Sequence, residues 1–393
     1  MRILLAFDKY KEALSAAGAC RAVAQALEAD GIAVVERPLT DGGEGFCSLL
    51  TDAAAGKFTQ LQVEGPLGEW REVSLGWVDI DSLPQAIRNK LASHASGKQS
   101  AKLAVIGMAD AAGLEQVAPA FRDPWRTTTL GVGRLLSRAV DSAADAVVIG
   151  LGGSATIDLG LGALAGLGFR FLDSEGNSCL PLPANWPSIV SIQLPAQPYL
   201  DALPSIFLAC DVDNPLFGER GAGVVFGLQK GLRKADLPRW ESLAHKMANL
   251  LEEAMATDTR FRDLSGAGAA GGFGYGLALA LKAQIVPGFQ WVADWLELKS
   301  VMESVDCVVT GEGRWDRGSL SGKGPHAVAE LAARMGKKVG VFAGAVEADA
   351  AAEMQKAYPK VSVLAITPKG LDLPQALAQT EENLLQKVRQ WLR

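Results

Sequence analysis

A strand pattern that breaks on glycines and resumes as a helical pattern constrains this chain more than any other stretch. Residues 146–162 have the sequence AVVIGLGGSATIDLGLG, and the first four form an unbroken apolar run typical of a buried strand. Glycines between 150 and 153 end the strand, and Ser154 or Thr156 is expected to cap a following helix. Glycines let a ligand approach the backbone, and free N–H groups at a helix start favour negative charge. The stretch therefore predicts a strand–turn–helix unit that holds an anion.

Strand patterns alternate with helical patterns at both ends of the chain. Apolar runs at 3–7 and 32–35 enclose a helical pattern, and the same alternation returns from 305–309 onward. This order is typical of a parallel sheet with crossover helices. A length of 393 residues also exceeds one ordinary domain. We expect two α/β domains: a Rossmann-like parallel-sheet domain built from both termini (1–63 plus 286–393) and an inserted second α/β domain (64–285).

Composition argues against several classes of protein. The chain is 49% hydrophobic and 21% charged, which is typical of a globular protein. A net charge of −6 without a basic run argues against a nucleic-acid partner. No apolar run reaches the roughly 18 residues of a transmembrane helix, so no membrane contact is expected. The apolar N-terminal run meets charges at Asp8 and Lys9, which is typical of a first strand rather than a signal peptide. Five scattered cysteines favour a reducing compartment, and we expect a cytoplasmic protein.

The same glycines match a dinucleotide-binding fingerprint. Residues 150–155 fit G-x-G-x-x-A, and Asp173 lies 23 positions after the first glycine. This match would indicate a nicotinamide-dependent oxidoreductase of a small hydroxy acid. Two features favour a phosphate and its metal ion instead: the match lies deep inside the chain, and Ser154, Thr156 and Asp158 supply two hydroxyls and a carboxylate. A tight turn that binds nothing is the structural alternative.

Carboxylates follow several of the expected strands. Asp8 ends the first strand, Asp41 and Glu44 lie in the motif DGGEG, and Asp211 ends a later strand. Ligands of α/β sheets bind beyond the carboxyl ends of strands, and carboxylates there suit a hard metal ion or a general base. The alternatives are solvated strand ends and, for Asp41 and Glu44, a capping box.

A charged loop follows the strand expected at 305–309. The segment TGEGRWDRGSLSGKGP covers 310–325 and carries Glu312, Asp316 and Lys323. It is not a P-loop, because glycine rather than serine or threonine follows Lys323. The functional interpretation is a mobile loop whose cations neutralise phosphate charge, and the alternative is a solvated surface turn.

Together the motifs resemble the glycerate kinases of the bacterial sugar-acid and glyoxylate pathways. The resemblance covers essentially the whole chain and rests on DKYKEALSA (8–16), PLTDGGEG (38–45), GLGGSATIDLGLG (150–162), ACDVDNPLFG (209–218), GAAGGFGYGLAL (268–279) and the loop 310–325. It implies phosphoryl transfer from ATP to D-glycerate with Mg²⁺, giving 2-phosphoglycerate. It also implies two α/β domains with the active site in the cleft between them.

Phosphoryl transfer needs positioned groups and neutralised charge, and we assign roles on that basis. We expect Asp41 or Asp8 to accept the substrate hydroxyl proton. We expect Lys11 and Lys323 to face the transferred group or the glycerate carboxylate, and Asp158 or Asp211 to bind Mg²⁺. The other predicted substrate- and nucleotide-binding residues are Lys9, Ser15, Gly42, Gly43, Glu44, Gly152, Gly153, Ser154, Ala155, Thr156, Gly268, Ala270, Gly271, Gly272, Gly311, Glu312 and Asp316.

The chain departs from the family pattern at several positions. Ile157 stands where the family usually has Asn, and Leu159 replaces a glycine. Lys9 and Glu12 differ from the usual Asp-Ser-Phe-Lys-Gly, and Trp315 replaces a leucine. Because Ile157 removes a polar group beside the turn, a non-catalytic sugar-acid-binding regulator is a second alternative to the kinase. The sequence is compatible with a homodimer.

Overall fold

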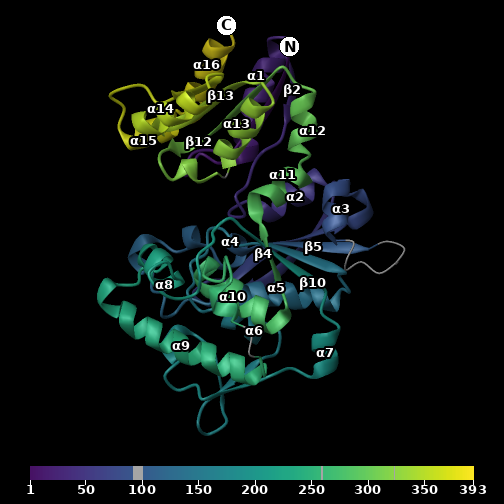
Figure 1. Cartoon of the computed structure of the whole chain (residues 1–393), viewed down its shortest axis with the longest axis vertical. Helices are drawn as coiled ribbons and strands as arrows, with labels where there is room; N and C mark the ends of the chain where they lie inside the picture. The colour runs from purple at the N-terminus through teal and green to yellow at the C-terminus, as the bar shows by residue number, and fades with distance from the viewer. Residues whose placement is uncertain (92–100, 258–259, 323) are drawn as a thin grey trace. The chain divides into compact units, whose positions relative to one another are not determined.

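The computed structural model divides the chain into two units, each with a large sheet of its own (Figure 1). It describes residues 1–91, 101–257, 260–322 and 324–393. Unit 1 comprises Met1–Asp41 and Phe289–Arg393, and unit 2 comprises Gly42–Gly288. The first boundary thus follows residue 41 and not the expected 63, because β3 (Lys57–Glu64) pairs with β4 (Trp70–Asp79) in the sheet of unit 2.

Unit 1 is built around a parallel sheet to which both ends of the chain contribute. Its strands are β1 (Arg2–Phe7), β2 (Ala33–Glu36), β12 (Cys307–Trp315), β13 (Lys338–Val346) and β14 (Val361–Ala365). The order is β14-β13-β12-β1-β2, and each of these neighbouring pairs is parallel. Its helices are α1 (Ala16–Ala29), α11 (Gly288–Trp295), α12 (Leu298–Glu303), α13 (Gly324–Arg334), α14 (Ala348–Ala357), α15 (Leu373–Ala378) and α16 (Thr380–Leu392). The predicted parallel sheet made from both termini is confirmed.

Helix α1 illustrates how local sequence sets the structure of unit 1. Ser15 has an extended backbone, and its Oγ accepts a hydrogen bond of 3.0 Å from the N–H of Gly18. This bond satisfies one of the donors that a helix start leaves open. Ala19, Val23 and Leu27 recur every fourth residue and are buried in the core of the unit. Burying a side chain such as Val23 or Leu27 contributes roughly 1.5–3 kcal/mol.

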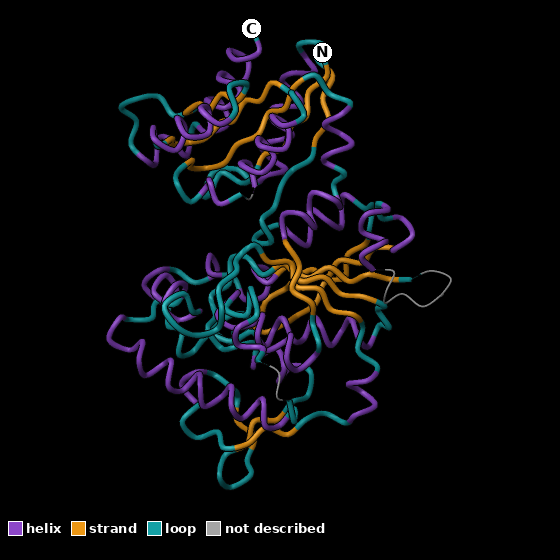
Figure 2. Tube along the Cα trace, viewed as in Figure 1, coloured by secondary structure: helices purple, strands orange, loops and turns teal. Residues whose placement is uncertain are grey.

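Unit 2 contains a six-stranded mixed sheet (Figure 2). Its order is β11 (Gln284–Pro287), β10 (Ser205–Cys210), β6 (Ala146–Gly150), β5 (Lys102–Gly107), β4 and β3. The pairs β3–β4 and β4–β5 are antiparallel, and the others are parallel. Helices α2 (Phe46–Ala53) and α5 (Leu130–Asp141) lie on opposite faces of this sheet (Figure 1).

The remaining elements of unit 2 complete its layers. A small sheet has the order β8 (Ser178–Cys179), β7 (Arg170–Leu172) and β9 (Ser191–Gln193). The other helices are α3 (Gln85–Leu91), α4 (Met108–Ala112), α6 (Leu161–Gly166), α7 (Gln197–Asp201), α8 (Ala222–Phe226), α9 (Leu237–Ala254) and α10 (Ala269–Leu281).

The stretch at 146–162 forms the predicted strand, but its helix begins later than expected. Strand β6 is fully buried between β5 and β10, and the chain then makes an irregular loop before α6. The N-cap of α6 is Gly160, and no side chain caps it. The expectation that Ser154 or Thr156 caps this helix is therefore wrong. Contacts with distant segments hold those two residues outside the helix.

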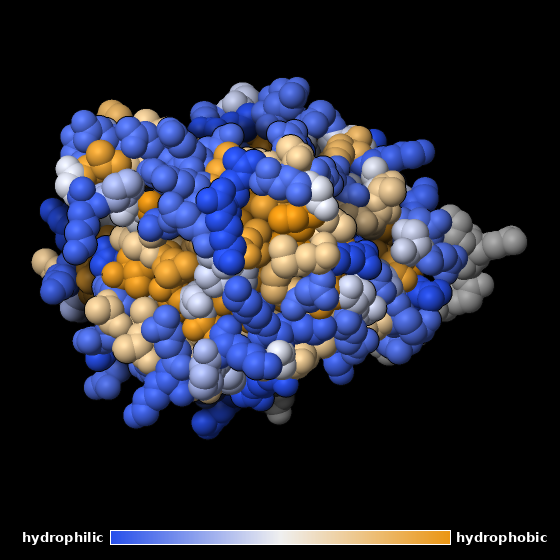
Figure 3. Space-filling model, turned by 90° about the horizontal axis from the view of Figure 1, so that it is seen from above, coloured by the Kyte–Doolittle hydropathy of each residue, from blue (hydrophilic) through white to orange (hydrophobic). Residues whose placement is uncertain are grey.

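Among the described residues, no helix combines the length and apolar character that a bilayer crossing requires. The face drawn in Figure 3 is largely hydrophilic, with apolar areas between the polar side chains. Apolar areas of this kind are ordinary on folded proteins.

Replacing Ser15 tests its role as a helix cap. We expect Ser15→Ala to lower the free energy of unfolding by about 1 kcal/mol, because the N–H of Gly18 loses its acceptor. Ser15→Asp should retain most of the stability, because aspartate caps as well as serine does. Urea unfolding followed by circular dichroism measures both variants. Equal losses in the two variants would contradict the capping role.

Candidate functional site

The residues 150–157, which we call the glycine turn, pack directly on the loop 42–45 in unit 2. The N–H of Gly152 donates to the carbonyl of Gly42 at 2.9 Å. A Cβ atom at Gly152 would lie 2.6 Å from the backbone nitrogen of Gly43. Because no Cβ tolerates so short a contact, glycine is required at 152. Two predicted segments that lie far apart in the sequence are therefore neighbours.

A short backbone pairing fixes the other edge of the glycine turn. The N–H of Leu114 donates to the carbonyl of Gly153 at 2.7 Å. The N–H of Ala155 donates to the carbonyl of Ala112 at 2.8 Å. Glu44 lies beside the turn, since a Cβ at Gly153 would come within 2.6 Å of its Oε1. The turn is thus held in place from both sides, by the loop 42–45 and by residues 112–114.

A left-handed backbone segment at the start of α10 closes over the glycine turn. Ala270, Gly271 and Gly272 all have positive φ, at 50°, 70° and 91°. The carbonyl of Gly271 accepts a hydrogen bond of 3.1 Å from the N–H of Leu159. A Cβ at Gly271 would lie 2.1 Å from the carbonyl oxygen of Thr156. The two segments predicted to bind nucleotide phosphates are therefore in contact.

Several hydrogen-bond donors of the glycine turn have no protein acceptor among the described residues. They are the backbone N–H groups of Ser154, Thr156 and Ile157, and the buried Oγ1 of Thr156 also has no partner there. Ser154 is 6% exposed, and Thr156 and Ile157 are fully buried. Leaving buried donors unpaired costs free energy that a bound acceptor relieves. Phosphate oxygens are acceptors of this kind, and successive N–H groups commonly bind them.

Lys230, which no sequence motif marks, lies behind the glycine turn. Its Nζ donates to Ser154 Oγ at 2.7 Å and to the carbonyl of Thr156 at 2.8 Å, and the residue is 3% exposed. Burial lowers its pKa to about 7, and the charge of Asp158 partly opposes this shift. Nothing near Lys230 in the sequence distinguishes it from a surface lysine.

Asp158 serves as an internal anchor of the loop before α6. Its Oδ2 accepts hydrogen bonds from the N–H and the hydroxyl of Thr129, both at 2.8 Å, and from the N–H of Gly162 at 3.3 Å. Its Oδ1 accepts from the N–H of Gly160 at 3.2 Å, and the residue is fully buried. Burial raises the pKa of Asp158, and these bonds oppose the shift. Its predicted role as a metal ligand therefore loses its support.

Asp211 is the better placed of the two predicted metal ligands. It follows β10 and lines a pocket of about 280 Å³ together with Asp213, Ser265 and the end of β11. Its side chain is partly exposed, unlike that of Asp158. Among the described residues, no group of three or more His, Cys, Asp or Glu side chains is arranged to hold a metal ion. Asp211 therefore stays a predicted ligand.

The dinucleotide fingerprint does not form a dinucleotide site. The six-residue helix α6 starts well after the glycines, so its N-terminus does not meet them as the motif requires. Asp173 follows β7 in the small sheet, where its Oδ1 accepts hydrogen bonds from the N–H groups of Glu175 and Asn177 at 2.9 Å. The oxidoreductase interpretation thus has no geometric support.

Unit 1 gathers three of the predicted carboxylates. Asp8 follows β1, Glu312 lies in β12, and both are affected by the charge of Asp41. Burial, together with the charges of Asp41 and Glu312, raises the pKa of Asp8 to about 7, although the N–H of Lys9 donates to its Oδ1 at 2.7 Å. Burial and neighbouring acids also raise the pKa of Glu312 to about 7. A carboxylate that titrates near neutral pH suits a general base.

The other predicted residues of unit 1 have varied surroundings. Ser15 caps α1, and a Cβ at Gly311 would lie 1.9 Å from the carbonyl of Phe342, so glycine is required there for strand packing. Asp316 Oδ1 accepts a hydrogen bond of 2.8 Å from the N–H of Gly318 and shapes its own loop. The backbone of Lys11 lies beside Gly313 in β12. Lys323 lies outside the described residues.

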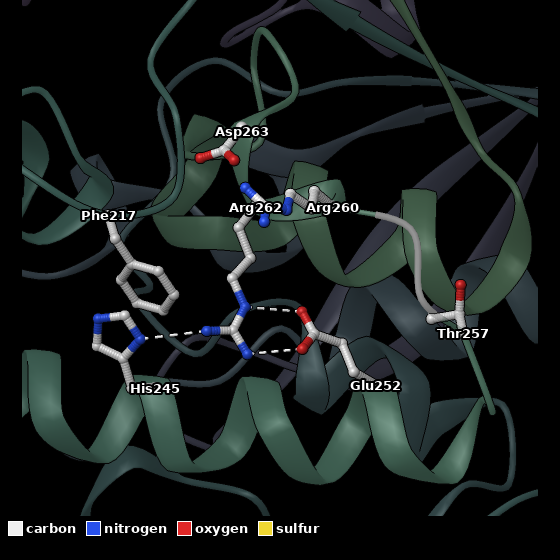
Figure 4. A pocket seen from close by; sticks show the side chains of 7 residues that line it. All are labelled: Phe217, His245, Glu252, Thr257, Arg260, Arg262 and Asp263. Carbon is white, nitrogen blue, oxygen red and sulfur yellow. Dashed lines mark hydrogen bonds and ion pairs between the residues drawn. The ribbon is translucent and has the colours of Figure 1, made fainter.

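An arginine network in unit 2 surrounds a pocket that no sequence motif indicates (Figure 4). Its volume is about 480 Å³. Arg262 forms a bidentate pair with Glu252 at 2.6 and 2.7 Å, and the rings of Phe217 and His245 stack beside it at 3.7 Å. Tyr275 of α10 donates to Glu252 at 3.1 Å. The network therefore joins α9 to α10, and we assign it a structural role.

Comparison with known proteins gives consistent matches over the whole chain. A model of the glycerate kinase family matches residues 3–393. The glycerate kinase of Bacillus cereus is 34% identical over 386 residues, covering 98% of this chain and 95% of that protein. The glycerate 2-kinase of Escherichia coli is 35% identical over 352 residues, covering 89% and 86%. A crystal structure described as a glycerate kinase 2 from Salmonella typhimurium has a TM-score of 0.74 at 34% identity, covering 100% of this chain and 97% of that one.

A pair of glycine substitutions tests the close packing of the turn. We expect Gly271→Ala to cost at least about 1 kcal/mol more than Gly176→Ala, because both have positive φ but only Gly271 faces another segment. A Cβ at Gly176 meets nothing within 4 Å. Chemical unfolding of the two variants measures the difference. Equal losses would show that the contact with Thr156 is unimportant.

Proposed function

Because the chain belongs to the glycerate kinase family, we propose that it transfers a phosphoryl group from ATP to D-glycerate and forms 2-phosphoglycerate. The observation that carries the proposal is the cluster of unpaired donors in the glycine turn, where Thr156 and Ile157 are fully buried. The name of the Escherichia coli relative, glycerate 2-kinase, supports the choice of the 2-hydroxyl.

The glycine turn of unit 2 is proposed to bind the phosphates of the nucleotide. Its N–H groups and the hydroxyl of Thr156 supply uncharged hydrogen-bond donors for these phosphates. Gly152 and Gly271 keep the turn free of Cβ atoms on the sides where other backbone segments approach. Such a rigid, prearranged set of donors suits phosphoryl transfer, which depends on positioning and charge stabilisation.

Asp8 of unit 1 is proposed as the base that accepts the proton of the substrate hydroxyl. Its pKa of about 7 matches the pH at which a general base works best. Asp41 is the second candidate from the sequence, and its effect here is to raise the pKa of Asp8. Lys9, Lys11 and Lys323 are proposed to attract the carboxylate of glycerate or the transferred group.

Mg²⁺ is proposed to bind at the end of β10 through Asp211. Magnesium sites in kinases commonly use one or two carboxylates and complete their coordination with phosphate oxygens and water. Asp211 is partly exposed beside a pocket of about 280 Å³ that Asp213 also lines, which fits that donor set. When bound, the ion would neutralise charge on the phosphate oxygens.

The proposed reaction is tested by ADP release from MgATP with D-glycerate. Parallel reactions contain L-glycerate, tartronate or no acceptor. We expect release only with D-glycerate, and phosphorus NMR should show phosphate on the 2-hydroxyl. If a folded sample binds D-glycerate but releases no ADP, the non-catalytic regulator is correct instead.

The pH dependence of turnover distinguishes Asp8 from Asp41. If Asp8 is the base, kcat/KM should fall about tenfold per unit as pH drops below about 7, because Asp8 becomes protonated. Asp8→Asn should lower kcat by roughly 10²–10⁴-fold. Asp41→Asn should keep kcat and move the acid limb to lower pH, since it removes a charge that raises the pKa of Asp8. Loss of turnover in Asp41→Asn alone would identify Asp41 as the base.

A further inference from the structure

The segment 228–240 lies behind the glycine turn and holds two successive carbonyl groups. Lys230 Nζ donates to the carbonyl of Thr156 at 2.8 Å, and Trp240 Nε1 donates to the carbonyl of Ile157 at 3.2 Å. Both donors are buried, with exposed fractions of 3% and 1%. We propose that Lys230 is a positioning residue that sets the affinity of the glycine turn for nucleotide phosphates. This inference rests on the function proposed above.

The hydrogen bond from Lys230 to the carbonyl of Thr156 fixes the direction of a backbone donor in the glycine turn. In a trans peptide the carbonyl and the following N–H point to opposite sides, and the described chain has no cis peptide bonds. When Lys230 holds the carbonyl of Thr156, the N–H of Ile157 must therefore face away from Lys230. The N–H of Ile157 donates to no acceptor in the part of the chain that the structure describes. Lys230 thus turns a donor toward the side where an anion can bind.

Lys230 also orients the hydroxyl group of Ser154. In its charged form Lys230 only donates, so Ser154 Oγ then acts as acceptor in their 2.7 Å bond. The hydroxyl hydrogen of Ser154 then remains available for an acceptor outside this pair. Lys230 therefore orients two donors of different kinds within one turn.

The charge of Lys230 is the third feature that favours an anion in the glycine turn. Within the described residues Lys230 forms no ion pair. The charge of Asp158 acts on the pKa of Lys230, but the oxygens of Asp158 already accept hydrogen bonds from Thr129 and two glycines. An unpaired buried ammonium is costly, and burial accordingly lowers its pKa to about 7. A phosphate in the glycine turn would supply the missing negative charge. The charge of Lys230 would in turn favour that phosphate over neutral ligands.

The test compares three variants by calorimetric titration with MgADP. Lys230→Met removes the charge and both hydrogen bonds, and we expect at least a tenfold loss of affinity with an unchanged KM for D-glycerate. Trp240→Phe removes a single neutral hydrogen bond and should weaken binding less. Lys246→Met is the matched control, because Lys246 also donates to two carbonyls, those of Trp186 and Pro187, at 3.0 and 2.9 Å. It should bind MgADP as the unaltered protein does.

A second measurement needs no variant of Lys230 and covers the case in which Lys230→Met does not fold. Titrations at pH 8 in buffers of different ionisation enthalpy should show proton uptake when MgADP binds. The uptake should persist in Asp8→Asn and in Glu312→Gln, which remove the two carboxyl groups of unit 1 whose pKa is also about 7.

Among the described residues, the charge of Asp158 acts on the pKa of Lys230, and Arg122 contacts the neighbouring backbone, since its Nη1 donates to the carbonyl of Gln229 at 3.3 Å. The carboxylate of Asp158 accepts hydrogen bonds from Thr129 and two glycines, which favour its charged form, and arginine does not titrate at this pH.

The outcomes separate this inference from the proposed function. The inference alone is overturned if the unaltered protein phosphorylates D-glycerate and Lys230→Met binds MgADP with an affinity within twofold of the unaltered protein. Lys230-dependent binding of MgADP without any turnover would overturn the proposed function and retain the inference. Absence of both MgADP binding and inorganic phosphate binding would overturn both.

Discussion

The close packing of backbone segments around the glycine turn is the constraint on which unit 2 depends. Gly152 and Gly271 face other backbone segments at distances that leave no room for a Cβ atom. Lys230 and Trp240 hold the carbonyls of the turn from behind. The N–H groups that remain are buried without protein acceptors. The turn is therefore less stable alone than with a bound acceptor, which is a common arrangement at ligand sites.

A different constraint governs unit 1, where parallel strands bring carboxylates together. Asp8 follows β1 and Glu312 lies in the neighbouring strand β12. Burial and the charge of Asp41 disfavour ionisation of both groups, so each titrates near neutral pH. Nearby cations, or protonation of one of these carboxyl groups, relieve this repulsion. The chemistry proposed for unit 1 is thus a consequence of the sheet topology rather than of one specialised side chain.

The sequence predicted features that depend on local pattern or on backbone space. Alternating strands and helices at both ends indicated the parallel sheet of unit 1. The glycine-rich segments were expected to let a ligand approach the backbone, and the structure shows other backbone segments packed closely against them. Predictions failed where distant contacts decide. Ser154 is a good local cap, but its pairing with Lys230, 76 positions later, keeps it outside the helix. Asp158 resembles a metal ligand in sequence, yet Thr129 occupies its carboxylate.

The most direct test of this account is amide hydrogen exchange of the glycine turn with and without MgADP. The N–H groups of Ser154, Thr156 and Ile157 have no protein acceptor among the described residues, so a phosphate that binds there must protect them. The account predicts slower exchange of these amides in the presence of MgADP and no change at Gly176, which lies in a loop of the small sheet. Saturating MgADP that leaves the exchange of residues 154–157 unchanged would contradict it.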